Sequence, residues 1–487
     1  MEKNELLRVF TPGGVLSPAD LKKILTIAED FGNDYVHFGS RQDILFPVNN
    51  NDRRGLHAIF KSIKTDFEYK GRKYQNITTS YVAFDIQPST AWISSSIYYY
   101  IMDPFDYRPT LKINITDPRQ SLVPLFSGNL NFIASPYDDY WYLYLNFPEF
   151  NLFQCWPVLV YSYDIAKVAK AIEDIFSLEY EAFSEKLFQR VNDLTQSSNR
   201  NISGELQLSF TPFSSYEGLN KMAGDQYWLG LYWRNNKFTI NFLLAVCALC
   251  AETRVGKICI TPWKSFIVKD IAGKDRIKWE KLCGRYGINM RHSSLELNWH
   301  LPVLDEEALQ LKRYLVKNFD QNDISTEGLT FAVKTSPMTL FTSIVIEQKQ
   351  SSRYAGNYDL VPSYQICYSK DFNPNTREYL VFAKDVEKED LAPLLMELTK
   401  MYFEQLNNET ETIISEKKPE IAAKKLVHQC SQCLTIYDEE YGDPAAGIAL
   451  GVAFNNLPQD YLCPLCESTK KEFKVVEMVG EKETLRF

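Results

Sequence analysis

The sequence predicts an α+β protein made of two copies of a two-domain block, followed by a linker and a small C-terminal module. Two strand–helix–strand units both begin with Phe-Thr-Pro, at residues 10–12 and 210–212. Each unit is followed by further strand-like segments and an amphipathic helix. Four cysteines lie beyond a charged stretch near the C-terminus. The shared order of elements indicates an internal repeat, and the cysteines indicate a separate module.

The first unit reads as a strand over residues 6–12, a helix over 17–32 and a strand over 34–48. Ser17 is a helix N-cap residue with proline after it, and Gly32 is a C-terminal stop signal. The second unit reads as a strand over 205–215, a helix over 239–253 and a strand over 256–268.

An α/β region follows each unit, because period-two patterns give way there to a helical pattern. In the first region the predicted strands lie within residues 108–118, 128–136 and 140–147, before a helix at 164–180. In the second region they lie within 328–337, 341–348, 364–369 and 377–384, before a helix at 388–406.

Composition limits the classes of function. The chain has 487 residues and a formal net charge of −9, which argues against a nucleic-acid surface because phosphate binding needs clustered Lys and Arg. No signal-peptide pattern occurs at the N-terminus, and no apolar run approaches the ~18 residues of a membrane span. A cytoplasmic location without membrane partners is expected. In a reducing compartment the ten cysteines are expected to be thiols or metal ligands rather than disulfides.

Residues 406–425 predict a linker, because this stretch is rich in charge and poor in large apolar groups. Beyond it, two C-x-x-C pairs are separated by 29 residues, 434–462, and are formed by Cys430, Cys433, Cys463 and Cys466. Two chelating turns brought together by a small fold present four thiolates in a tetrahedron, which suits iron or zinc.

The residues around these pairs narrow the choice. The patterns C-x-x-C-x-x-x-Y-D from residue 430, Gly-Asp-Pro at 442–444 and G-V-A-F-N-N-L-P-Q-D-Y-L-C-P-L-C at 451–466 closely resemble rubredoxins. The resemblance implies one iron held by four cysteine sulfurs and used as a one-electron carrier. It also implies a small aromatic core of Tyr437, Phe454, Tyr461 and Phe473.

Two positions depart from the rubredoxin pattern. Leu434 and Glu467 stand where the family usually has glycine after the second and fourth cysteines. Because hydrogen bonds to sulfur tune the reduction potential, the motif alone does not predict the reduction potential of the iron. The alternative is a structural zinc ribbon, whose cysteine pairs are usually closer together in sequence.

Residues 10–46 resemble the ferredoxin-like half-domain of sirohaem nitrite and sulfite reductases. In that family a Gly-Gly turn precedes the helix and a strand delivers an Arg-Gln pair, here Gly13, Gly14, Arg41 and Gln42. Residues 108–176 resemble the family's sirohaem-binding region, and residues 256–268 resemble the repeated half-domain. Over about residues 1–405 this likeness is weaker than the rubredoxin match.

Arg41 and Lys112 are the candidate cofactor-binding residues that this resemblance implies. A guanidinium fork matches the oxygens of nitrite, sulfite or a tetrapyrrole carboxylate. The family commonly has two basic residues on the corresponding strand, whereas this chain has Thr110 and Lys112 there. The alternative for both candidates is a solvated or ion-paired surface charge.

The cysteines of the family's four-iron cluster are missing. No cysteine occurs between Cys283 and Cys367, and Ser336 stands where the family tends to have cysteine. A serine hydroxyl is a poor ligand for such a cluster, so no [4Fe–4S] cluster is expected. The cysteines outside the C-terminal pairs, Cys155, Cys247, Cys250, Cys259, Cys283 and Cys367, are expected to pack in the core.

The predicted fold class is therefore α+β, with two repeats of a ferredoxin-like half-domain plus a sirohaem-domain-like α/β unit, followed by a small rubredoxin fold. The predicted domains are 1–75 and 200–300 (half-domains), 76–195 and 301–405 (sirohaem-domain-like regions), 406–425 (linker) and 426–487 (rubredoxin).

The predicted function is iron-dependent electron transfer with a redox partner protein, in the service of assimilatory nitrate, nitrite or sulfite reduction. The protein is expected to be an electron carrier or a component of an oxidoreductase rather than a complete nitrite or sulfite reductase. One alternative is a sirohaem-binding oxidoreductase that uses the rubredoxin as internal donor. The other is a zinc-bearing, non-catalytic interaction protein.

Overall fold

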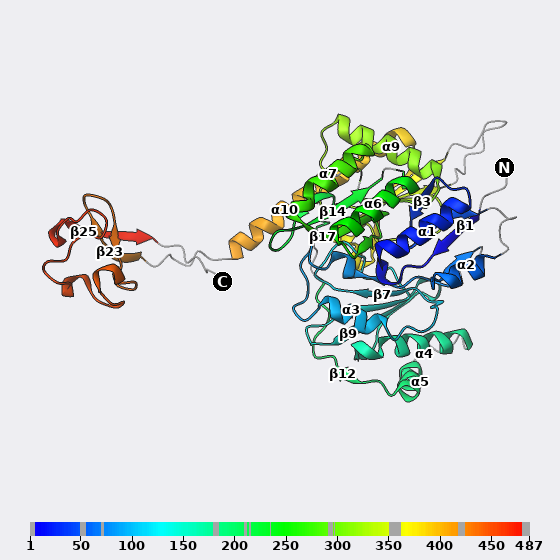
Figure 1. Ribbon diagram of the computed structural model, residues 1–487, viewed down its shortest axis with the longest axis horizontal. Coiled ribbons are helices and arrows are strands. Elements are labelled where there is room, and N and C mark those ends of the chain that lie inside the picture. The colour runs from blue at the N-terminus through cyan, green and yellow to red at the C-terminus, as the bar shows by residue number, and fades with distance from the viewer. Residues whose placement is uncertain are drawn as a thin grey trace. The chain divides into compact units, whose positions relative to one another are not determined.

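The computed structural model describes residues 5–48, 55–69, 73–178, 185–208, 212–213, 216–233, 235–290, 296, 298–349, 362–416 and 424–479. The chain divides into two compact units, Met1–Tyr402 and Phe403–Phe487. The first unit is called the body below, and Figure 1 labels its main helices and strands. No helix among the described residues is long and apolar enough to cross a membrane.

Two five-stranded sheets form the centre of the body, in the orders β15-β3-β4-β1-β5 and β13-β14-β17-β16-β2. The strands of the first are β1 (Glu5–Val9), β3 (Tyr35–Phe38), β4 (Ile44–Val48), β5 (Phe67–Tyr69) and β15 (Phe238–Thr239). Those of the second are β2 (Val15–Leu16), β13 (Gly218–Lys221), β14 (Gln226–Tyr232), β16 (Ile258–Ile260) and β17 (Ser265–Ala272). The associated helices are α1 (Pro18–Asp30), α2 (Leu56–Ser62), α6 (Ile240–Thr253) and α7 (Arg276–Arg285).

The two central sheets exchange strands. The short β15, from the second half of the body, pairs with β3 through Phe238 opposite Val36. In return β2, from the first half, pairs with β16 through Leu16 opposite Ile258. Each sheet is therefore completed by a strand from the other half.

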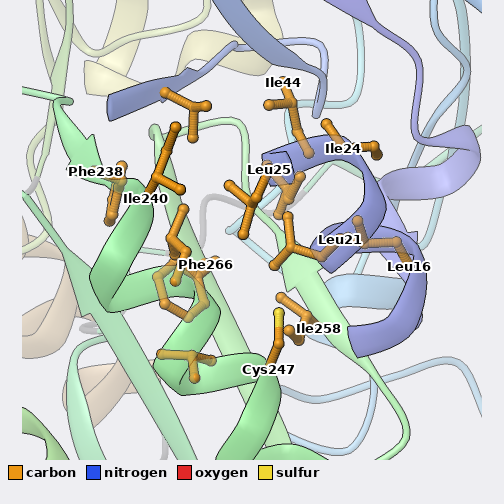
Figure 2. Packing of buried hydrophobic residues seen from close by; sticks show 14 of the residues in the cluster. Leu16, Leu21, Ile24, Leu25, Ile44, Phe238, Ile240, Cys247, Ile258 and Phe266 are labelled. Atoms are coloured by element: carbon orange, nitrogen blue, oxygen red, sulfur yellow. The ribbon is translucent and has the colours of Figure 1, made fainter. Parts of the chain in front are cut away.

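Helices α1 and α6 pack on each other in one hydrophobic core shared by the two halves. Figure 2 shows Leu21 and Leu25 of α1 facing residues of α6, among them Ile240 and Cys247. The α1 helix begins as predicted, because the Ser17 side chain accepts a hydrogen bond from the backbone N–H of Asp20 at 3.1 Å. Burial of these apolar faces is the main stabilising contribution, since short helices gain little from propensity alone.

Two further sheets flank this core and share the topology of four of their strands. In the order β6-β7-β8-β9, the first two pairings are parallel and the third is antiparallel, and β18-β19-β20-β21 repeats that pattern. The first sheet has β6 (Thr78–Thr79), β7 (Ile113–Thr116), β8 (Leu130–Ala134), β9 (Tyr140–Phe147), β10 (Leu152–Cys155), β11 (Val158–Tyr161) and β12 (Asn199–Asn201). The second has β18 (Trp299–His300), β19 (Phe331–Lys334), β20 (Ile344–Lys349), β21 (Ser363–Ser369) and β22 (Tyr379–Val386). The matching topology confirms the predicted α+β class.

The other helices of the body are α3 (Ser95–Met102), α4 (Ile165–Leu178), α5 (Glu185–Thr195) and α9 (Glu306–Gln321). Helix α10 (Lys388–Glu416) leads into the C-terminal unit. That unit contains a three-stranded sheet, β24-β23-β25, formed by β23 (Lys424–Cys430), β24 (Ile436–Tyr437) and β25 (Phe473–Val479).

Four predictions about elements need correction. No strand forms over the described part of 205–215 apart from one isolated bridge at Phe213. The strands before α6 in the second half are instead β13, β14 and the short β15. The predicted strand over 34–48 is a hairpin, because a turn separates β3 from β4. The predicted strand over 256–268 is likewise a hairpin, formed by β16 and β17. Helix α10 reaches Glu416 and β23 begins at Lys424, so both ends of the predicted linker are regular structure. The rest of that linker, 417–423, lies outside the described residues, and the domain boundaries stay predictions.

Candidate metal centre

The four C-terminal cysteines converge on one point. Their Sγ atoms all lie within 4.8 Å of one another. The Sγ atoms of Cys430 and Cys466 are 3.7 Å apart, and those of Cys433 and Cys463 are 3.4 Å apart. A tetrahedron with metal–sulfur bonds of ~2.3 Å has edges of ~3.8 Å, so the sulfur positions fit one metal ion. In the part of the chain that the structure describes, no other group of His, Cys, Asp or Glu side chains has this arrangement.

The two cysteine pairs lie on turns with matching backbone bonds. The N–H groups of Leu434 and Glu467 each donate to the carbonyl of the first cysteine of their own pair, at 2.9 Å in both turns. The N–H groups of those first cysteines, Cys430 and Cys463, donate at 2.8 Å to the carbonyls of Thr435 and Ser468. The turns therefore form a pseudo-symmetric pair that supports the four sulfurs from both sides.

Leu434 and Glu467 have left-handed backbone conformations, with φ of 64° and 57°. Side chains other than glycine, asparagine and aspartate rarely adopt this region, which explains why glycine is the usual residue at these positions. The turns keep their shape here without glycine. Leu434 projects outward, with 64% of its surface exposed.

Exposure differs between the inner and outer sulfur ligands. Cys430 and Cys463 are buried, whereas Cys433 is partly accessible and Cys466 is exposed. The hydroxyl oxygens of Thr435 and Ser468 lie 3.1 Å from the Sγ atoms of Cys433 and Cys466, respectively. Each outer cysteine is therefore in contact with a hydroxyl group.

Hydrogen bonds influence the pKa values of these thiols. Bonds from the Thr435 hydroxyl and backbone lower the pKa of Cys433 to about 6, and backbone bonds of Cys433 and Gln432 lower the pKa of Cys430. Bonds from Ser468 lower the pKa of Cys466, but the crowded thiols of Cys433 and Cys463 outweigh them and raise it to about 11. Since metal ions bind thiolates, the lowered pKa values favour metal binding.

The predicted aromatic core of the module is present. Tyr437, Phe454, Tyr461 and Phe473 are all buried and in mutual contact. The Tyr461 hydroxyl donates to Asp443 Oδ2 at 2.9 Å, which satisfies its buried polar group. His428, which was not predicted to join this core, stacks its ring on Phe454 with centroids 4.0 Å apart. A single histidine on a strand carries no pattern that would have predicted this contact.

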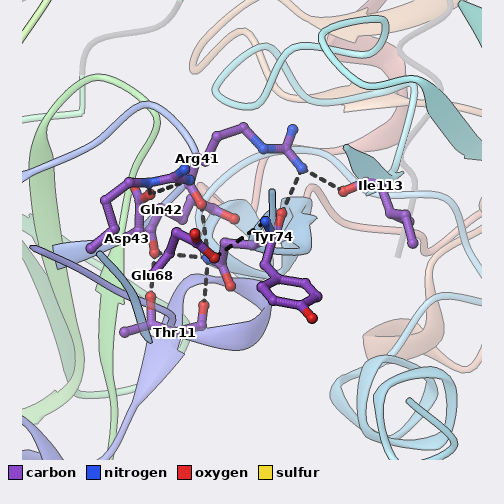
Figure 3. Close-up of polar contacts among 9 residues, drawn as sticks. Thr11, Arg41, Gln42, Asp43, Glu68, Tyr74 and Ile113 are labelled. Carbon is purple, nitrogen blue, oxygen red and sulfur yellow. Dashed lines mark hydrogen bonds and ion pairs between the residues drawn. The ribbon is translucent and has the colours of Figure 1, made fainter. Parts of the chain in front are cut away.

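Arg41 lies in the turn between β3 and β4, not on a strand as the family pattern predicts. Its guanidinium donates to the Asn76 carbonyl at 2.7 Å, to the Ile113 carbonyl at 2.8 Å and to Asn114 Oδ1. Figure 3 shows the guanidinium pointing toward Ile113. Removal from water lowers the pKa of Arg41 to about 9, which still leaves a cation at neutral pH. These bonds tie the turn to β7.

Gln42 shares this turn and has a buried side chain that bonds to Thr79 in both directions, donating at 3.1 Å and accepting at 2.9 Å. The backbone of Gly14 lies so close that an added Cβ would be 2.6 Å from the Gln42 side chain. The Gly-Gly turn and the Arg-Gln pair noted in the sequence therefore belong to one contact region.

Lys112 lines two cavities of the body, with volumes of about 690 and 830 Å³. Its Nζ donates to Thr339 Oγ1 at 3.2 Å. Arg41 lines only the larger of the two cavities. Thr110, on the same segment, uses its backbone N–H to bond Glu173 at 2.8 Å. Arg41 and Lys112 thus share one cavity, and their roles as cofactor-binding residues stay a prediction.

Two buried basic residues of the larger cavity were not predicted from the sequence. His300 is 6% exposed, and its Nδ1 has no hydrogen-bond partner among the described residues. Burial lowers the pKa of His300 well below its ordinary value, so the imidazole is neutral at pH 7. Lys264 donates to the Leu301 carbonyl, and burial lowers its pKa to about 7.

The remaining cysteines are dispersed through the body. Cys247 and Cys250 are buried in the core of α6, where burial raises the pKa of both thiols to about 12. Cys259 and Cys283 are buried as well, whereas Cys155 and Cys367 are partly accessible. A thiol with a raised pKa in an apolar site is inert, which agrees with a packing role.

Comparison with protein families gives two matches. Residues 427–473 match the family model for rubredoxin, and residues 2–62 match the model for the nitrite/sulfite reductase ferredoxin-like half domain. Together these matches cover the metal module and the first half of the central pair of sheets.

Three curated relatives are similar to the C-terminal part. Rubredoxin-1 of Alcanivorax borkumensis is 46% identical over 50 residues, which are 10% of this chain and 93% of that protein. Rubredoxin of Acinetobacter baylyi is 41% identical over 51 residues, 10% of this chain and 94% of that protein. High molecular weight rubredoxin of Moorella thermoacetica is 33% identical over 85 residues. The matched stretch is 16% of this chain and only 37% of that protein.

Among solved structures, the Mycobacterium tuberculosis NirA protein resembles the body. The TM-score is 0.63 with 14% sequence identity, and the match covers 81% of this chain and 80% of that one. At this identity the likeness concerns the fold alone. Because the identity with short rubredoxins extends over nearly their whole length, the chain belongs to the rubredoxin family through its C-terminal domain, which is fused to a body with a nitrite/sulfite reductase-like fold.

Proposed function

We propose that the protein is a one-electron carrier whose rubredoxin domain serves a redox partner protein in assimilatory nitrate, nitrite or sulfite reduction. The observation that carries the proposal is the set of four converging sulfurs, of Cys430, Cys433, Cys463 and Cys466, on two matching turns. A bound iron would supply the ferrous–ferric couple. The protein residues hold the ion, shield one side of it and leave the other side accessible.

The unequal exposure of the ligands supports electron transfer rather than a purely structural role. Cys430 and Cys463 face the aromatic core, whereas Cys466 is exposed. Leu465, beside Cys466, has 73% of its surface exposed. An electron can thus enter or leave through an outer ligand without any rearrangement of the fold.

The body is proposed to act as a docking unit for the partner. Fusion to a docking unit raises the effective concentration of a carrier near its partner without any new contact at the metal. The nitrite/sulfite reductase-like fold supports a partner from the same chemistry, and the missing cluster cysteines argue against a complete six-electron reductase in this chain.

Metal analysis and an absorption spectrum of the full-length protein test the proposal. The expected result is about one iron per chain and a visible spectrum that bleaches on reduction and returns on oxidation. The variant Cys433→Ser should lose that spectrum, whereas the matched variant Cys250→Ser, in the core of the body, should keep it. Zinc in place of iron, in protein from iron-replete cells, would refute the carrier function and favour the zinc-bearing interaction protein.

A second candidate function is tetrapyrrole binding by the body, with the rubredoxin domain as electron source. The larger cavity supports it, because Arg41 and Lys112 there would suit the carboxylates of sirohaem. His300 Nδ1, which has no hydrogen-bond partner among the described residues, would be available to hold a metal ion. Added sirohaem should give a Soret band that changes in His300→Ala and weakens in Lys112→Ala. Absence of that band in the wild-type protein would reject this candidate.

A further inference from the structure

We propose that the hydroxyl groups of Thr435 and Ser468 set the reduction potential of the metal centre by donating hydrogen bonds to its two outer thiolates. The inference rests on the proposed function, in which the four cysteines hold a redox-active iron. It assigns a role to two residues that lie outside the set of ligands.

The first support is geometric. Thr435 Oγ1 lies 3.1 Å from Cys433 Sγ, and Ser468 Oγ lies 3.1 Å from Cys466 Sγ. A protonated Cys433 thiol donates to Thr435 Oγ1, whereas a thiolate has no proton, so the hydroxyl is then the donor. In both turns the hydroxyl residue stands two positions after the outer cysteine and follows a residue in the left-handed conformation. The same contact therefore occurs twice, in two turns with matching backbone hydrogen bonds.

The second support is the choice of residues. Leu434 and Glu467 occupy left-handed positions at which glycine is the better residue, and the residue after each of them has a short hydroxyl side chain. Backbone bonds from Thr435 and Ser468 reach the same sulfurs. Each outer sulfur is thus in reach of two donors from one residue, the backbone N–H and the hydroxyl.

The direction of the effect follows from charge. With four thiolates the site carries a net charge of −1 when the iron is ferric and −2 when it is ferrous, because reduction adds one electron and breaks no bond. A donor near sulfur stabilises the more negative state more strongly. The hydroxyl protons stay on their oxygens. Both hydroxyls therefore raise the potential, and their removal should lower it.

The test compares the midpoint potential of full-length variants by spectroelectrochemical titration. Thr435→Val and Ser468→Ala should each lower the potential, and the double variant should lower it further. Thr435→Ser should keep the wild-type value, because it keeps the hydroxyl. Ser431→Ala is the matched control, since the Ser431 hydroxyl lies in the same turn but donates to Glu472 at 3.1 Å.

Iron content and the visible spectrum are measured on every sample, so that loss of metal is not mistaken for a change in potential. Equal potentials in the wild type, Ser431→Ala and Ser468→Ala, at full iron content, would overturn the inference. Should Thr435→Val fail to hold iron, Ser468→Ala at the exposed ligand decides the question alone. A wild-type protein without iron would instead overturn the proposed electron-transfer function.

Discussion

Replacing Arg41 by methionine is expected to destabilise the body. Methionine has a similar length but no donors, so the substitution removes the bonds to the carbonyls of Asn76 and Ile113 and to the Asn114 side chain. The turn between β3 and β4 would then lose its polar attachment to β7. The Asn76 side chain, which donates to the Arg41 carbonyl at 2.8 Å, would lose part of its support as well.

The magnitude follows from these bonds. A hydrogen bond to a charged group contributes about 1.5–3 kcal/mol, and an acceptor left unsatisfied adds a desolvation cost. Three such bonds would sum to more than about 4 kcal/mol if they were independent. Because Arg41 lines a cavity, water can reach part of the vacated space and offset some of the loss. A destabilisation of about 3 kcal/mol is therefore expected.

Differential scanning calorimetry of the full-length protein at pH 7 measures the effect. At ~2 °C per kcal/mol, the rate for domains of a few hundred residues, the body's thermal midpoint should fall by about 6 °C. Arg41→Lys should lie between the wild type and Arg41→Met, because a lysine keeps the charge but loses the planar fork. Arg276→Met, which removes an exposed pair with Glu280, should change little.

A midpoint for Arg41→Met within 1 °C of the wild type would refute this reasoning. It would show that the guanidinium contributes little to folding and would favour a role in holding an anion. Loss of anion binding at unchanged stability is the signature of such a role, since ligand-binding residues are often dispensable for folding.

Three other perturbations test other parts of the structure. Lys264→Met should raise stability by up to about 5 kcal/mol at pH 7 and below. The sign is opposite to that for Arg41→Met because the buried Lys264 ammonium donates to one carbonyl, that of Leu301, whereas the Arg41 guanidinium satisfies three acceptors that its removal would leave unpaired. The pKa of Lys264 is about 7 in the folded protein and ordinarily 10.5, so between these pH values the unfolded chain binds one proton more than the folded chain. The stability of the wild type therefore rises with pH across that window. The stability difference between variant and wild type, measured by denaturant titration, should shrink over the same window. Gly328→Ala should lower the body's thermal midpoint, because φ is +82° and a Cβ would lie 2.2 Å from the Tyr402 hydroxyl. Removing the metal with acid and chelator should abolish the thermal transition of the C-terminal domain and leave that of the body in place, and a single unchanged calorimetric trace would contradict this.

Much of the metal domain could be predicted from the sequence. The ligand spacing, the aromatic core and the absence of glycine at Leu434 and Glu467 are all local features of a short stretch. The hydroxyl contacts of Thr435 and Ser468 were missed, although the two residues stand at equivalent places in the two turns. Their significance depends on distances to sulfur, which spacing alone does not give.

In the body, the alternation of strands and helices predicted most elements, but not the pairing between them. The strands β2 and β15 have two residues each and pair with partners far away in the chain, so no local pattern indicates them. The turn at Arg41 could have been predicted, because Gly39, Ser40 and Asp43 are common turn residues. The helical continuation of α10 to Glu416 follows from the absence of glycine and proline over 394–418, which outweighed the polar composition.

The exchange of β2 and β15 has a consequence for how the body can be divided. A fragment that ended between the two halves would leave each sheet with an open edge where the borrowed strand belongs. Open edges invite pairing with other chains, so such fragments are expected to aggregate or to recombine when they are produced together. The reciprocal exchange makes the two halves mutually dependent, so neither is expected to fold stably without the other.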